Sequence, residues 1–102
     1  MRRVITRYVE IAKCAGHEDE ALSDISRNLR WLLGAVGESE IRLQMKKIAG
    51  RCVLRADMVH GGLLDAVIFA ISLSSVDGVY LMPIRSSGTL RGLLKPAVGV
   101  QL

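Results

Sequence analysis

The sequence has few residues of the kinds that build catalytic or metal centres. It contains two cysteines and two histidines in 102 residues, and Cys14 and Cys52 form no C-x-x-C pair. Only His17 and His60 could join them, so neither a disulfide framework nor a zinc site has its usual spacing. We therefore expect two inert thiols in or near the core. No paired-carboxylate or Cys-His constellation suited to hydrolysis is present.

Long apolar runs are also missing. No apolar stretch reaches the roughly 18 residues that a membrane-spanning helix needs. Arg2 and Arg3 are followed by an alternating run, whereas a signal peptide would have a continuous apolar block there. We expect an untargeted, cytoplasmic protein that does not interact with membranes.

Apolar residues make up 50% of the chain, enough for one compact core, so residues 1–102 are expected to form a single domain. Lysine and arginine total 14 against 10 acidic residues, a formal charge of +4. This mild excess makes a nucleic acid or another polyanion a plausible partner.

The hydrophobic pattern changes period along the chain. Residues 3–12 alternate and are rich in β-branched types, which predicts a strand. Residues 18–36 have helical spacing, with acidic residues first and glycines at the end. The runs "SEIRLQMKKI" and "RCVLRA" alternate on either side of Ala49-Gly50 and predict a hairpin.

A second helix is expected within "ADMVHGGLLDAVIFAISLSS", with Asp57 as its N-cap. Asp77-Gly78 then turns into "VYLMPIR", a strand that Pro83 assigns to an edge of the sheet. The order β-α-β-β-α-β with a short helix after it predicts an α+β fold. Its expected form is ferredoxin-like or RRM-like, a four-stranded antiparallel sheet with both helices on one face.

The other face of such a sheet would be free to bind a ligand. The segment "GRCVLRAD" has no aromatic residue, so base stacking of the RRM type is not expected. Arg42, Lys46, Arg51 and Arg55 are evenly spaced in their strands, and pairing across the hairpin could bring all four to one face. They form either a phosphate-binding surface or a solvated face with Glu40 as a partner.

The stretch "RSSGTLRGLLKP" follows the last predicted strand. Ser86 or Ser87 could cap a short helix whose first turn contains Gly88, Thr89 and Leu90. Free backbone N–H groups would then lie near Arg85 and Arg91, an arrangement that suits a phosphate. The alternative is an ordinary serine-capped helix whose leucines pack on the sheet.

Three segments, "TRYVEI", "VLRADMVHGGLLDAVIFAISL" and "RSSGTLRGLLK", together resemble the small α/β protein subunit of archaeal and eukaryotic ribonuclease P, called protein component 2 in archaea. The most specific match is Ser87-Gly88-Thr89-Leu90-Arg91, and Arg55 falls where the family tends to have an arginine. Ala56 departs from the pattern, because a cysteine is frequent there.

This resemblance implies a non-catalytic RNA-binding subunit that stabilises the catalytic domain of ribonuclease P RNA for 5′ leader removal from precursor tRNA. The RNA and its Mg²⁺ ions would cleave, so no catalytic residue, metal ligand or cofactor is assigned to this chain. The implied partners are that RNA and the barrel-shaped protein component 3. Apolar surfaces that include Leu93, Leu94 and the tail "AVGVQL" are candidates for contact with the protein partner or for self-association.

The residues expected to contact RNA phosphates are Arg42, Lys46, Arg51, Arg55, Arg85, Ser87, Gly88, Thr89 and Arg91. The competing hypothesis is a ligand-binding or oligomerising regulatory domain of the same fold, which would show no salt-dependent affinity for RNA.

Overall fold

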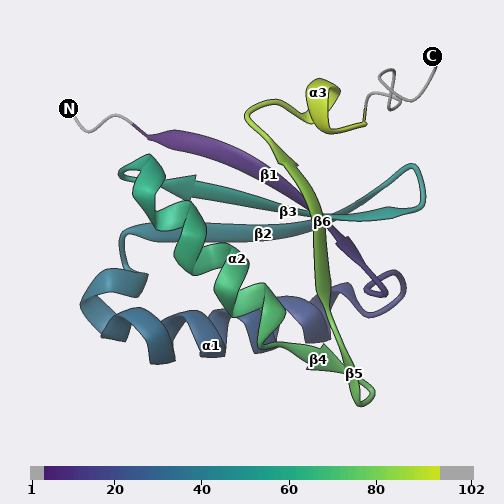
Figure 1. Cartoon of the computed structure of the whole chain (residues 1–102), viewed down its shortest axis with the longest axis horizontal. Coiled ribbons are helices and arrows are strands. Elements are labelled where there is room, and N and C mark those ends of the chain that lie inside the picture. The colour runs from purple at the N-terminus through teal and green to yellow at the C-terminus, as the bar shows by residue number, and fades with distance from the viewer. Residues whose placement is uncertain (1–3, 95–102) are drawn as a thin grey trace.

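The computed structural model describes residues 4–94, which fold as an α+β domain with a four-stranded antiparallel sheet and three α-helices (Figure 1). The elements along the chain are β1 (Ile5–Ala12), α1 (Glu18–Glu38), β2 (Ile41–Ile48), β3 (Arg51–Met58), a 3₁₀ turn η1 (Gly61–Leu63), α2 (Leu64–Ser72), β4 (Ser75–Val76), β5 (Val79–Tyr80), β6 (Met82–Ser87) and α3 (Leu90–Leu94). None of the helices in the described part is both long and apolar enough to cross a membrane. The tail "AVGVQL", which is a candidate for protein contacts, lies outside the described residues.

The sheet has the strand order β2-β3-β1-β6, and every neighbouring pair is antiparallel. β1 therefore lies inside the sheet, and β6 forms one edge, as Pro83 predicts. Val9 of β1 pairs with Leu54 of β3, which pairs with Met45 of β2. This register aligns the apolar residues of three strands on one face.

α1 and α2 cover that apolar face and contact each other (Figure 1). Apolar spacing of three and four residues gives α1 its buried stripe, which includes Ile25 and Leu29. Val67 and Ile71 of α2 complete a continuous core with the sheet. α3 lies at the far end of β6, away from both helices (Figure 1).

The β2–β3 hairpin has the tight turn that its sequence predicts. Ala49 and Gly50 both have positive φ, 53° and 75°. This backbone twist joins two antiparallel strands through only two residues and favours glycine at the second position. The turn thereby fixes the pairing register of β2 and β3 from Ile41 to Met58.

Several predicted boundaries were wrong. α1 runs to Glu38, with a break at Gly34, whose φ of 75° and ψ of 173° are accessible to glycine. Asp57 lies inside β3 and does not cap α2, which begins at Leu64 after η1. The Asp77-Gly78 turn joins the separate ribbon β4–β5, and the edge strand starts only at Met82.

The expectation for the cysteines was also wrong in one respect. Both are buried, as expected, but a disulfide joins Cys14 to Cys52 with their Cα atoms 5.8 Å apart. Cys14 follows β1 and Cys52 lies in β3, so strand pairing brings together residues 38 positions apart. Sequence spacing alone does not show this proximity.

We expect unreduced protein to show no reactive thiol after unfolding, because both cysteines are paired. Reduction should lower the free energy of unfolding by about 4 kcal/mol for a closed loop of this length, measured by urea denaturation with and without reductant. A Cys14→Ala, Cys52→Ala variant is the control and should not respond to reductant. Two reactive thiols in unreduced protein would contradict the pairing.

Candidate nucleic-acid interface

The sheet face opposite α1 and α2 is here called the open face. Alternation along the strands directs one residue in two to it, and the register aligns these residues in rows that cross the sheet. The rows are Thr6–Asp57–Arg42, Ser87–Tyr8–Arg55–Gln44, Arg85–Glu10–Val53–Lys46 and Arg51–Ile48.

The open face is predominantly basic. The four hairpin residues predicted to share a face do so, and β6 adds a fifth basic side chain, so the set is Arg42, Lys46, Arg51, Arg55 and Arg85. Two carboxylates, Glu10 and Asp57, lie among them, which leaves a formal charge of +3. The face therefore offers an anionic ligand more charge than its own acids neutralise.

Glu10 holds two of the arginines. Its carboxylate lies 3.4 Å from Nε of Arg85 and 3.7 Å from Nε of Arg51, and the residue is only 8% exposed. A buried carboxylate needs opposite charge nearby, because burial disfavours its ionised form. Glu10 thus binds together side chains from β1, β3 and β6. Glu40, the partner expected for the basic face, does not take this role.

Asp57 organises the other end of the face. It accepts hydrogen bonds from Thr6 Oγ1 at 2.6 Å and from Arg55 Nε at 3.2 Å. Burial raises the pKa of Asp57, but these hydrogen bonds and the charges of Arg55 and Arg42 outweigh burial, so the pKa lies below its ordinary value. The carboxylate consequently stays ionised and holds Arg55 against the sheet.

Arg42 and Lys46 differ from the other basic residues of the face. Both are exposed, and neither forms an ion pair with a carboxylate among residues 4–94. A groove of about 610 Å³ at the start of β2 is lined by Arg42, by the carboxylates Glu40 and Asp57, and otherwise mostly by apolar residues. These two cations are the most available for a phosphate, since binding would break no existing ion pair.

The Ser87-Gly88-Thr89 stretch forms a local hydrogen-bonded turn before α3. Ser87 Oγ accepts from the Thr89 N–H at 3.3 Å, and Thr89 Oγ1 accepts from the Gly92 N–H at 3.0 Å. Thr89 therefore occupies the cap position predicted for Ser86 or Ser87. A Cβ at Gly92 would come within 2.7 Å of Ser87 Oγ, so glycine keeps this turn compact. The stretch therefore caps a short helix, as the alternative predicts, but Thr89 is the cap in place of a serine.

α3 packs on the open face. Leu93 is fully buried, as is Val53 on that face, and the Leu93 carbonyl accepts a hydrogen bond from Arg85 Nη1 at 3.5 Å. The prediction that Leu93 belongs to an exposed protein-contact surface was therefore wrong. Arg91 of α3 is exposed, so α3 adds a sixth cation beside the sheet.

Tyr8 was not predicted to lie on the open face. The third strand has no aromatic residue, but β1 supplies one, and the register places Tyr8 between Arg55 and Ser87 on the open face. The signal was present in the alternation of "TRYVEI", where Thr6, Tyr8 and Glu10 share one face.

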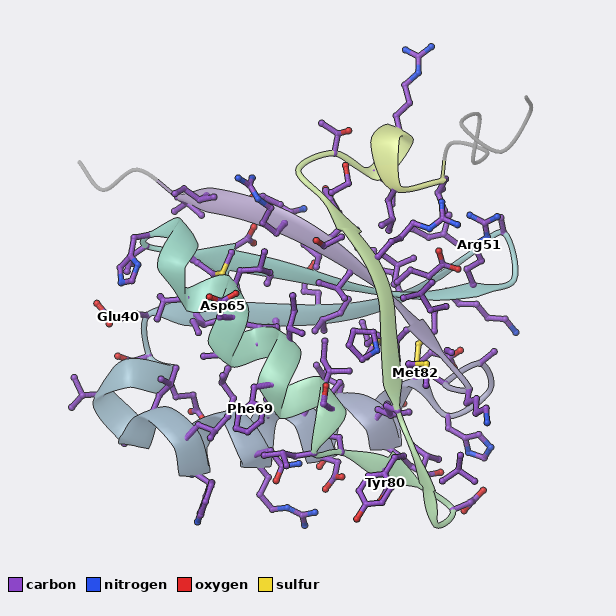
Figure 2. The ribbon with its side chains drawn as sticks, in the orientation of Figure 1. Glu40, Arg51, Asp65, Phe69, Tyr80 and Met82 are labelled. Atoms are coloured by element: carbon purple, nitrogen blue, oxygen red, sulfur yellow. A yellow bond between two sulfur atoms is a disulfide. The ribbon has the colours of Figure 1, made fainter. Side chains whose placement is uncertain are left out.

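Several exposed apolar side chains lie on the helices and along β5 and β6. Figure 2 shows Phe69 on α2 and Tyr80 and Met82 where β5 leads into β6, while Arg51 lies on the β2–β3 hairpin. Trp31 on α1 is 78% exposed and Met82 is 61% exposed. Neither residue is part of the core.

No family model matches the chain, and no curated protein matches it. Within residues 4–94 no group of three or more His, Cys, Asp or Glu side chains is placed to hold a metal ion. The open face contains arginines that are paired with carboxylates and two exposed cations, Arg42 and Lys46. It offers a ligand positive charge, hydrogen-bond donors and one aromatic ring.

The lowered pKa of Asp57 gives a testable pH dependence. Its carboxyl resonance should titrate below 3.8, and Thr6→Val, which removes the hydroxyl donor, should raise that midpoint. Because the folded pKa is depressed, the associated stability is complete above the ordinary pKa and is lost as pH falls through the folded value. NMR titration measures the midpoint, and equal midpoints in both proteins would contradict the role of Thr6.

Proposed function

We propose that this chain is a non-catalytic RNA-binding subunit of a ribonuclease P, of the protein component 2 type, that stabilises the catalytic domain of the RNA for 5′ leader removal from precursor tRNA. The observation that carries the proposal is the open face. Five basic side chains from three strands share it, and α1 and α2 pack on the other side of the sheet. Phosphate groups of a folded RNA are the ligand whose charge complements this surface.

The finer fold assignment is part of this proposal. The element order, with β4–β5 counted as an excursion before β6, and the strand order β2-β3-β1-β6 support a ferredoxin-like arrangement. The stretch Ser87-Gly88-Thr89-Leu90-Arg91 leads from the edge strand into α3, which is the position that the resemblance to protein component 2 implies.

The chain would contribute electrostatics and no chemistry. Bringing RNA helices together is opposed by repulsion between phosphates, and each lysine or arginine contact relieves it while releasing counterions. Arg42 and Lys46 would bind phosphates directly, whereas Arg51, Arg55 and Arg85 are first held by Glu10 and Asp57. Mg²⁺ bound to the RNA would supply the cleavage chemistry.

A protein partner would use a different surface. With Leu93 buried, the exposed apolar side chains Phe69, Tyr80, Met82 and Ile84 of α2, β5 and β6 are the better candidates for contact with protein component 3. The same residues favour the second hypothesis, a regulatory domain that oligomerises through its edge strand. That alternative requires no affinity for RNA.

The test is precursor tRNA cleavage by a reconstituted archaeal ribonuclease P RNA at low Mg²⁺, with protein component 3 present and this chain added or withheld. We expect the chain to restore leader removal and an Arg42→Gln, Lys46→Gln variant to lose most of that effect. Lys13→Gln with Lys47→Gln is the charge-matched control. Lys47 follows Lys46 on β2 but points to the other face, and Lys13 is exposed in the turn after β1.

The control double variant should retain wild-type activity. Equal losses in both double variants would indicate a general charge effect and contradict a specific open-face interaction. Cleavage that ignores the chain, under conditions where an authentic subunit works, would contradict the ribonuclease P proposal.

Arg91 provides a second test, since it is exposed on α3 and makes no ion pair among the described residues. Arg91→Gln should weaken binding to the ribonuclease P RNA, and the slope of log K against log salt should fall by about 0.7–0.9 for one lost phosphate contact. The melting temperature should not change. Lys13→Gln serves as the control, and an unchanged slope for Arg91→Gln would remove this residue from the interface.

A further inference from the structure

Tyr8 lies at the centre of the open face, and its surroundings differ from those of every other aromatic residue in the chain. It pairs with Arg55 of β3 on one side and Ser87 of β6 on the other, and Gln44 of β2 pairs with Arg55. The row Ser87–Tyr8–Arg55–Gln44 therefore crosses all four strands, a span of about 14 Å at ordinary strand spacing.

The groups of this row suit a flat ligand that carries hydrogen-bonding edges. The Tyr8 ring is partly exposed, and Arg55 beside it is held in place by Asp57 at 3.2 Å. Gln44 is exposed at one end and offers both a donor and an acceptor. The Ser87 hydroxyl at the other end accepts from Thr89 N–H and keeps its own O–H to donate.

The neighbouring rows complete the surroundings of Tyr8. On one side, α3 contacts β1 and β6, and the row that contains Glu10 and Val53 is buried. On the other side, Thr6 and Asp57 are joined by a hydrogen bond. The partly exposed Tyr8 ring lies between these two rows, and the exposed cations Arg42 and Lys46 flank Gln44 on β2.

We infer that this row is a stacking platform for one unpaired nucleobase, so that the RNA bound to the open face is single-stranded at this point. The inference rests on the proposed RNA-binding function and adds the class of RNA. Bases in a duplex are stacked on one another and present no free face to a protein ring, whereas bases in loops and single strands do. Stacking on aromatic rings tolerates any base, with specificity left to polar groups such as Gln44 and Ser87.

The experiment compares a fluorescein-labelled ten-nucleotide oligouridine with a labelled sixteen-base-pair RNA duplex, by fluorescence anisotropy over a range of KCl concentrations. Tyr8→Leu should weaken oligouridine binding roughly 5- to 100-fold and leave the salt slope unchanged, because no phosphate contact is lost. Tyr8→Phe should bind within twofold of the wild type. Trp31→Leu is the aromatic control, since Trp31 is exposed on α1, and it should not affect binding.

A second measurement covers the case in which Tyr8→Leu does not fold. Photocrosslinking of the wild-type protein to a 4-thiouridine oligonucleotide should modify the tryptic peptide that begins at Tyr8 and ends at Lys13. Crosslinks confined to other peptides would overturn the inference.

The outcomes separate the two proposals. Unchanged oligouridine binding by a folded Tyr8→Leu variant, together with tight duplex binding that requires Arg42 and Lys46, would overturn the stacking platform and leave the RNA-binding function supported. Absence of salt-dependent binding to either RNA and to the ribonuclease P RNA would overturn both.

Discussion

The register of β1 against β3, and of β3 against β2, is the constraint on which the rest of the structure depends. Side chains alternate with a period of two, so a slip of one residue would exchange the two faces of a strand. In the observed register Val9, Leu54 and Met45 lie toward the helices, while Tyr8, Arg55 and Gln44 lie on the open face. Burial of the apolar set against α1 and α2 makes any slipped register unfavourable, because cations would enter the core.

The same register explains why a face with five cations is tolerated. Glu10 and Asp57 fall between strands that carry arginines, and they pair with Arg51, Arg85 and Arg55 at 3.2–3.7 Å. Ion pairs of partly exposed groups add modest stability, but they fix where the guanidinium groups lie. The two cations without such pairs are on the outer strand β2, where repulsion is weakened by solvent.

α3 links the fold to the candidate site. Its short helix would have little stability in isolation, so it depends on the burial of Leu93 and on the contact from Arg85 to the Leu93 carbonyl. It contacts β1 and β6, the strands that contribute Tyr8 and Ser87 to the open face. The Ser-Gly-Thr stretch that leads into it therefore has a structural role in placing the helix.

The sequence by itself determined the α+β class and the hairpin at Ala49-Gly50. It also determined the edge position of the strand with Pro83 and the shared face of Arg42, Lys46, Arg51 and Arg55. All of these follow from local periodicity and turn chemistry. Only the tertiary structure decided the Cys14–Cys52 bond, the burial of Leu93, the place of Asp57 in β3, and the meeting of Tyr8 with Arg55 and Ser87. Each of these depends on contacts between residues distant in the chain, and local spacing does not show which side chains of strands far apart in the sequence meet.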